Sequence, residues 1–327
     1  MLLATLAVAC LTLVPAFDPP TVAEKTEFRQ TATAADVSAF LTELAAKSSF
    51  VRITELGTSG EGRTIPLVLV ADPAVSSAEE ARKSGKIVIA LLGSIHPGEC
   101  DGKEALLALA RDIALARAAK AEGPVAADLL DHAVLAFIPL YNPDGNERVD
   151  PGNRPGQNGP ETMGRRENAA GLDLNRDFVK LEAPETRALP RFIRTPDPAI
   201  LIDTHTTNGS FHRFPLTYDT IKNPAGDAAL VAFARGTLLP AIASAAKEKH
   251  ALDTFWYGNF EDGHSRWESY PDEPRYIVNG MGLRNRIGIL TESYSYAPYR
   301  DRVKAQEAFI AECLNATLAQ REDIRRF

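Results

Sequence analysis

Four short apolar segments constrain the fold of this chain more than any other feature of its sequence. Each holds five to eight residues, and none alternates apolar with polar side chains. The segments are residues 86–92 (KIVIALL), 133–140 (AVLAFIPL), 199–203 (AILID) and 287–291 (IGILT). Such runs are typical of strands that are covered on both faces, as in parallel sheets. The sequence therefore predicts an α/β fold with a largely parallel sheet between helices.

Helical patterns occupy much of the chain outside these segments. They cover residues 33–48, 102–119, 227–249 and 300–326. Residues 65–71 predict a further strand. Residues 142–182 are different, because they are rich in Gly, Asn, Pro and Arg and have no periodicity. A loop of about 40 residues in a compact domain usually has a function. No linker divides the chain, so we expect a single domain over residues 17–327.

The composition excludes two classes of protein. Of the 327 residues, 45% are apolar and 24% are charged, which is ordinary for a globular chain and excludes a disordered or fibrous one. Lys and Arg number 36 against 43 Asp and Glu, which gives a formal net charge of −7. Because nucleic-acid binding needs a dense basic face, this balance argues against a nucleic-acid partner.

Residues 1–16 predict a secretory signal peptide. They contain no charged side chain, their apolar core is short for a membrane span, and they end in small residues. An alternative is a lipid anchor on Cys10. We expect export to the periplasm or the extracellular space, and no other stretch long enough to cross a bilayer. Cys100 and Cys313 are too few for a disulfide framework, so we expect them as buried thiols, although they could pair.

Ionisable side chains follow the apolar segments. His96 and Glu99 come after the first segment, His205 after the third and Glu292 directly after the fourth. In an open α/β sheet, ligands bind at the edge where the carboxyl ends of the strands meet. We therefore expect these four side chains to lie close together.

Two histidines and one glutamate with an open fourth position are the ligand set of a catalytic zinc site. His96 and Glu99 are three residues apart, so they face the same way if the chain turns into a helix there. His205 would supply the third ligand, and Asp203 would orient an imidazole. Zinc polarises a carbonyl and activates water, and Glu292 is the candidate general base.

The long loop offers arginines for a charged substrate or an oxyanion. Arg165 and Arg166 are adjacent, and Arg176 follows Asn175. A guanidinium binds a carboxylate in a fork geometry and stabilises developing negative charge. For most arginines, however, a solvated position on the surface is the ordinary alternative.

These residues resemble the zinc metallocarboxypeptidase family, the carboxypeptidase A-like peptidases. The resemblance rests on short motifs that occur in the family's order over residues 25–320. The motifs are Gly57-x-Ser59-x-Glu61-Gly62-Arg63, His96-Pro97-Gly98-Glu99 with His205 about a hundred residues later, Gly171-x-Asp173-x-Asn175-Arg176, and Leu290-Thr291-Glu292-Ser293.

The resemblance implies a mixed, largely parallel twisted sheet of about eight strands between helices, and one zinc ion per chain. It also implies release of a C-terminal residue from a peptide. The implied site residues are the zinc ligands His96, Glu99 and His205, the general base Glu292, the transition-state arginine Arg166, and Asn175 and Arg176 for the substrate carboxylate.

The chain departs from the family pattern in three places. Many relatives carry an arginine between the His and Glu, where this chain has Pro97-Gly98, and one contact to the upstream substrate is thereby removed. The family's mobile tyrosine has no clear match, although Tyr270 and Tyr276 lie in the right region. Arg284 and Arg286 in the stretch 276–286 could border the side-chain pocket and favour acidic side chains there, although a position on the surface is the more common outcome for an arginine.

Three functions fit these observations. The first is a secreted zinc carboxypeptidase that acts on peptides, including cell-wall peptides. The second is a zinc amidohydrolase of the succinylglutamate desuccinylase or aspartoacylase type, whose members share the ligand motif but are typically cytosolic. The third is a peptide-binding relative without catalysis, which would usually lack the base or a ligand.

Overall fold

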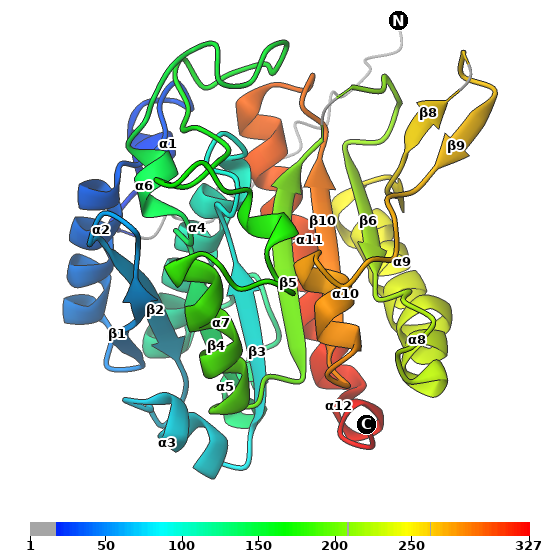
Figure 1. The fold of residues 1–327 in the computed structure, drawn as a ribbon. Coiled ribbons are helices and arrows are strands. Elements are labelled where there is room, and N and C mark those ends of the chain that lie inside the picture. Colours follow the sequence, from blue (N-terminus) through cyan, green and yellow to red (C-terminus); the bar gives the residue numbers. More distant parts are fainter. Residues whose placement is uncertain (1–17, 208, 262) are drawn as a thin grey trace, which may run out of the picture.

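A twisted sheet of eight strands forms the centre of the computed structural model (Figure 1), which describes residues 18–207, 209–261 and 263–327. The strand order is β1-β2-β4-β3-β5-β10-β6-β7. The strands are β1 (Val51–Thr58), β2 (Thr64–Val70), β3 (Ile87–Leu92), β4 (Ala133–Ile138), β5 (Ile200–Thr206), β6 (Leu216–Thr220), β7 (Thr254–Trp256) and β10 (Ile287–Ser293). The hairpin of β8 (Asn259–Glu261) and β9 (Arg266–Glu268) stands apart. The predicted signal peptide and Cys10 lie outside the described residues.

The four apolar segments form the parallel centre of the sheet. β4, β3, β5 and β10 are neighbours and run parallel, while β1, β2 and β6 pair in antiparallel fashion at the flanks. β7 pairs in parallel with β6 at the edge. The predicted α/β class with a mixed, largely parallel sheet of about eight strands is confirmed.

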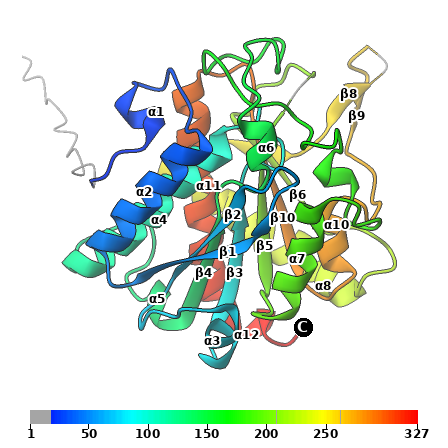
Figure 2. The same cartoon turned by 60° about the vertical axis from the view of Figure 1, so that its left-hand side comes forward.

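Helices cover both faces of this sheet (Figure 2). One face packs against α2 (Ala34–Lys47), α4 (Asp101–Ala119), α5 (Leu129–His132), α8 (Ala228–Phe233), η2 (Ala234–Leu238), α9 (Leu239–His250), α11 (Tyr299–Ala319) and α12 (Arg321–Ile324). The other face packs against α3 (Ala78–Lys83), α7 (Pro184–Arg194) and α10 (Ile277–Gly282). A short helix, α1 (Val22–Lys25), packs beside Tyr299.

The continuous apolar pattern of β3 follows from this double cover. Ile87, Ile89 and Leu91 belong to the core on the α4 side, whereas Val88, Ala90 and Leu92 belong to the core on the α7 side. Successive side chains of a strand point to opposite faces. A strand with helices on both sides therefore has no solvent face on which to place polar residues.

The stretch between β4 and α7 is the long loop that the sequence predicts. Its regular structure is limited to α6 (Pro143–Asn146) and the 3₁₀ turn η1 (Leu174–Arg176). Buried Asp144 ties it to the turn between β1 and β2, because it accepts hydrogen bonds from Ser59 Oγ at 2.8 Å, Glu61 N at 2.9 Å and Arg63 Nη1 at 2.7 Å. The Gly57-to-Arg63 motif therefore anchors the loop over the carboxyl edge of the sheet.

One helical stretch in the described part of the chain, Ala228–His250, is long and apolar enough to cross a membrane by length and composition. The helix predicted over residues 227–249 is therefore present, but the expectation that no stretch after the N-terminal one is long enough to cross a bilayer is wrong by this test. Leu238, Ile242 and Ala246 on its inner face belong to the core beside α11. Core helices pass the same test of length and hydropathy.

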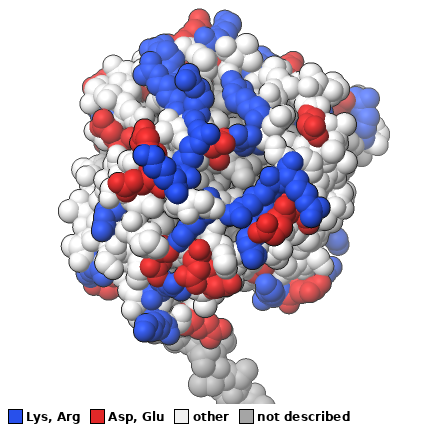
Figure 3. Space-filling model, turned by 90° about the horizontal axis from the view of Figure 1, so that it is seen from below, with Lys and Arg blue, Asp and Glu red and all other residues white. Residues whose placement is uncertain are grey.

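The amino edge of the parallel strands lies at the opposite end of the molecule from the long loop. Figure 3 views this end, where Lys and Arg side chains gather over the upper half with acidic side chains among them. Asp197 precedes β5, Arg286 precedes β10, and the two form an ion pair beside a hollow of about 200 Å³. Arg286 therefore lies at the far end of β10 from Glu292 and does not border the candidate site.

A buried ion pair joins α11 to the start of α4. The guanidinium of Arg302, which is 0% exposed, donates to Asp101 Oδ2 at 2.8 Å and to Oδ1 at 3.2 Å. It also donates to backbone carbonyls of the long loop, including Asn158 O at 2.7 Å. This one side chain therefore holds two helices and the loop together.

We expect Arg302→Met to lower the free energy of unfolding by about 3–5 kcal/mol, because it leaves the Asp101 carboxylate buried without its cation. Urea unfolding followed by circular dichroism measures the change. Arg300→Met is the matched control on the exposed side of α11, with an expected loss below about 1 kcal/mol from its contact with the Phe28 ring. Equal losses in the two variants would contradict the role of the buried pair.

Candidate metal centre and active site

The three predicted metal ligands come from the ends of two neighbouring strands. His96 and Glu99 lie in the turn between β3 and α4, which closes with a hydrogen bond from Glu99 N to His96 O at 2.8 Å. His205 lies near the end of β5, the strand that pairs with β3. All three side chains are buried, and they form a group whose candidate ligand atoms lie within 4.8 Å of one another.

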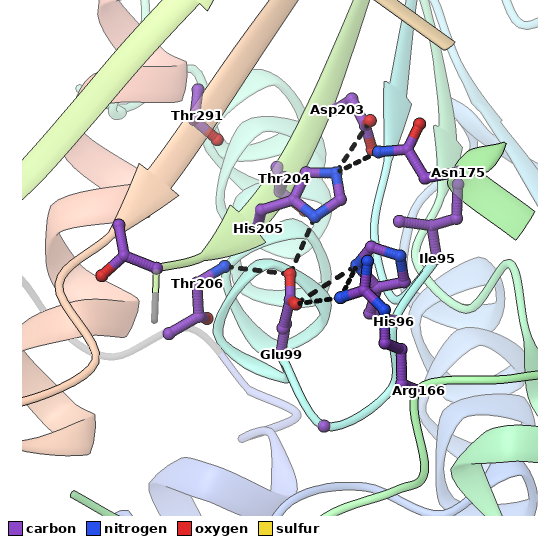
Figure 4. A network of polar contacts seen from close by, with 12 residues as sticks. Ile95, His96, Glu99, Arg166, Asn175, Asp203, Thr204, His205, Thr206 and Thr291 are labelled. Carbon is purple, nitrogen blue, oxygen red and sulfur yellow. Dashed lines mark hydrogen bonds and ion pairs between the residues drawn. The ribbon is translucent and has the colours of Figure 1, made fainter. Parts of the chain in front are cut away.

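The ligand atoms of this group face one common point (Figure 4). His205 Nδ1 is 2.8 Å from Glu99 Oε2, and His96 Nδ1 is 3.2 Å from Glu99 Oε1. Ligand atoms bound to one tetrahedral zinc at 2.0–2.2 Å lie roughly 3.3–3.6 Å apart. The donor set and its spacing therefore fit zinc.

Two aspartates orient the histidine rings. His96 Nε2 lies 3.0 Å from Asp173 Oδ1, and His205 Nε2 lies 2.9 Å from Asp203 Oδ2. A ring nitrogen that donates to a carboxylate carries the proton, so the other nitrogen keeps its lone pair for a metal. Both aspartates thus direct Nδ1 toward the common point, and Asp203 has the place that the sequence predicts for it.

The charges of the group are mutually stabilising. Burial alone would raise the pKa of Glu99, but His96, Arg154 and His205 hold it well below its usual range. Burial would lower the pKa of His205, yet Asp203 and Glu99 keep it well above its usual value. The carboxylate is therefore ready to bind a cation, whereas His205 must release its second proton when a metal binds, as metal ligands must be deprotonated.

Glu292 lies beside this group. In the parallel pairing of β5 and β10 it stands opposite His205. The side chain is buried, with 7% exposure, and within the described residues its carboxylate makes no hydrogen bond to protein. Burial raises the pKa of Glu292 to about 8, and the neighbouring Glu99 adds to the rise. A nearby dication would favour its charged form.

The structure separates the two adjacent arginines of the loop. Arg166 lines the cavity above the metal ligands, donates to Asp173 Oδ2 at 3.0 Å and reaches Glu99 Oε1 at 3.3 Å. Arg165 points outward and pairs with Glu167 at 2.8 Å. Arg166, the predicted member of the pair, is therefore the one that faces the site.

Asn175 and Arg176 lie on η1 at the same cavity. Asn175 Oδ1 accepts a hydrogen bond from Ile277 N at 3.0 Å, and its amide nitrogen is 3.3 Å from His205 Nε2. The Arg176 guanidinium packs over the Tyr276 ring at 4.5 Å, and its side chain is 38% exposed. The pair therefore presents one amide and one accessible cation to a ligand.

All seven predicted site residues line one cavity of about 550 Å³. One part of its remaining wall is aromatic and aliphatic, formed by Tyr257, Tyr270, Tyr276, Val278 and Leu290, and the other part is mostly polar, formed by Asn153, Arg154, Pro155, Asp173 and Thr206. The hydroxyl of Tyr270 is buried and has no hydrogen-bond partner among the described residues. Arg284 is outside the cavity, with its guanidinium 4.5 Å from the Phe178 ring. Of the two alternatives for Arg284 and Arg286, a position outside the cavity is therefore the one observed, and they do not make the pocket basic.

Several residues of the cavity are not predicted from the sequence, among them Tyr257 and Arg154. Tyr257 follows the short edge strand β7, and Arg154 comes from the aperiodic part of the loop. Neither belongs to a motif. The one sequence signal for Arg154 is Gly98, since many relatives carry an arginine between the His and Glu of the motif.

Cys100 and Cys313 are free and buried, which confirms them as isolated thiols. Burial raises the pKa of Cys100 to about 12 and also raises the pKa of Cys313. Both are therefore protonated thiols, unsuited to bind a metal or to act as nucleophiles.

The fold and the ligand group together place this chain among the zinc metallopeptidases. The family is more specific, because residues 37–273 match the sequence model of the zinc carboxypeptidases, Peptidase_M14. The chain belongs to this family.

This chain is similar to known carboxypeptidases, and the similarity covers a different share of the chain in each comparison. Carboxypeptidase 2 of Trichophyton rubrum is 30% identical over 167 residues, which are 51% of this chain and 27% of that protein. Carboxypeptidase D of Mus musculus is 31% identical over 162 residues, 44% of this chain and 12% of that protein. This chain thus spans well under two thirds of either relative. A metallo-carboxypeptidase structure from Burkholderia cenocepacia shares the fold, with a TM-score of 0.63 and 18% identity, over 87% of this chain and 69% of that one.

Proposed function

We propose that this protein is a zinc-dependent carboxypeptidase that removes the C-terminal residue of a peptide. The observation that carries the proposal is the shared cavity, in which the accessible Arg176 lies beside the group of His96, Glu99 and His205. A guanidinium at this place selects a free carboxylate. The proposed enzyme therefore cuts next to a chain end.

Substrate binding follows from the donors on η1. The terminal carboxylate accepts hydrogen bonds from Arg176 and from the amide nitrogen of Asn175. The side chain of the terminal residue then packs against the part of the cavity wall that is formed by Tyr257, Val278 and Leu290. Because this wall carries no charged side chain, we propose that uncharged terminal residues are preferred.

Hydrolysis is assigned to three kinds of group. One zinc ion per chain, held by His96, Glu99 and His205, supplies Lewis acidity toward a carbonyl and toward water. Glu292 accepts the proton of the attacking water and passes it to the leaving amine. Arg166 donates hydrogen bonds to the oxyanion that develops on the scissile carbonyl.

The test compares peptides that have a free C-terminus with the same peptides amidated. We expect loss of a single C-terminal residue from the free peptides, no cleavage of the amides, and no reaction after chelation, all measured by mass spectrometry. In Arg176→Met, KM for the free peptide should rise, because the carboxylate loses its cation. Cleavage of acylated amino acids in place of peptides would instead support the amidohydrolase function. A zinc-loaded protein that cleaves neither would be a non-catalytic relative.

Export and cell-wall peptide substrates are further parts of the proposal. They rest on the uncharged apolar character of residues 1–16 and on the arrangement of one catalytic domain over residues 17–327. An exported peptidase would meet the peptides of the cell wall.

A further inference from the structure

Arg154 is a loop residue whose side chain reaches the metal-ligand group. It lies 55 residues after Glu99 in the chain, and no regular element holds its backbone. Nevertheless its side chain is only 10% exposed and lines the cavity. A long cationic side chain is rarely buried to this extent unless its donors are satisfied.

Every nitrogen of the Arg154 guanidinium has an acceptor. Nη1 donates to Glu99 Oε1 at 3.0 Å, and Nε donates to Gln157 Oε1 at 3.1 Å. Nη2 donates to the carbonyl oxygens of Thr206 at 2.7 Å and Thr207 at 2.8 Å. Thr206 directly follows His205, so one planar group links two of the candidate zinc ligands.

Gly98 leaves the space that Arg154 occupies. A Cβ at position 98 would lie 2.7 Å from Arg154 Cγ and 2.9 Å from Gly164 O, closer than real Cβ contacts. Gln157, the partner of Arg154, donates to Gly98 O at 3.0 Å. The absence of a side chain at Gly98 therefore makes room for the side chain of Arg154 beside Glu99.

We propose that Arg154 is a positioning residue, which holds Glu99 and the chain after His205 in the geometry that binds zinc. The inference rests on the proposed zinc-dependent function. Arg154 differs from Arg166 in its burial, because the side chain of Arg166 is 32% exposed and that of Arg154 only 10%. Since Arg154 is buried and its three nitrogens donate to four protein acceptors, it acts through Glu99 rather than on the substrate.

The test measures zinc affinity in Arg154→Met and Arg154→Lys by competition with a chromogenic chelator. Loss of a group that orients a metal ligand typically weakens metal binding by 10–100-fold, and we expect a loss in this range for Arg154→Met. Lysine keeps the charge but not the planar fork, so Arg154→Lys should recover only part of the affinity. The visible spectrum of the cobalt-substituted protein should change in both variants, and KM should stay near the wild-type value while kcat falls.

Arg148→Met is the matched control, because Arg148 comes from the same loop but pairs with Glu61 away from the cavity. We expect its zinc affinity and cobalt spectrum to match the wild type. Unchanged zinc affinity and spectrum in Arg154→Met would overturn the inference, and an isolated rise in KM would make Arg154 a substrate contact. If the methionine variant does not fold, the lysine variant gives the same readouts. A different result would contradict the proposed peptidase function, namely a wild-type protein that binds zinc but cleaves no peptide.

Discussion

Glu292→Gln is expected to reduce kcat by roughly 10²–10⁴-fold, the contribution typical of a general base, while zinc binding is retained. Glutamine has nearly the shape of glutamate but cannot accept the proton of the attacking water. Glu292 is not one of the clustered ligand residues, so its change leaves the metal group intact. Steady-state kinetics on a free peptide, together with the zinc content of the same sample, measures both effects.

The control for this variant is Glu167→Gln, a change of the same size outside the cavity, where Glu167 pairs with Arg165. Its turnover should equal that of the wild type. Near-normal turnover in Glu292→Gln would mean that another group takes the proton. A loss of zinc together with activity would show that Glu292 supports the metal instead.

His205→Ala is expected to abolish activity by removing zinc from the site. The change leaves His96 and Glu99 as ligands, and two ligands do not make the three-ligand site of a catalytic zinc. It also leaves Asp203 buried beside an empty space. Zinc content after dialysis should fall from one ion per chain to nearly none, as measured by atomic absorption.

The wild-type protein stripped by a chelator separates metal loss from misfolding. Addition of zinc should restore the stripped wild type but not His205→Ala, and circular dichroism should show that both remain folded. His132→Ala changes a half-buried histidine whose Nε2 lies 3.7 Å from Asp128 Oδ2, and this variant should keep its full zinc content. Full zinc content in His205→Ala would remove His205 from the ligand set.

The sequence predicts well which side chains lie close together, because the rule behind this prediction is geometric. His205 and Glu292 end neighbouring parallel strands, so they meet at one edge whatever the details of the packing. The parallel centre of the sheet is equally easy to predict, since strands that are buried on both faces consist almost entirely of apolar residues.

The flanking strands and the cavity wall are harder to predict, because their buried polar residues depend on partners from other segments of the chain. β6 carries buried Thr217 and Asp219, and Asp219 is satisfied by Lys222 and Arg235 rather than by any local pattern. Arg154 has no periodic context at all. Its position depends on acceptors that come from two other segments, so only the folded chain reveals it.

One half of the cavity is formed by regular strands, and the other half by an irregular loop. His205 on β5 and Glu292 on β10, the groups proposed for hydrolysis, lie in a ladder of strand hydrogen bonds, in which any shift would displace the neighbouring strands. Arg166, Asn175 and Arg176 belong to an irregular segment that is fastened to the scaffold at Asp144. Surface segments tolerate exchange and insertion far better than strands do. Substitutions in the long loop can therefore change which ligand the cavity binds, while the positions of His205 and Glu292 on the strands stay the same.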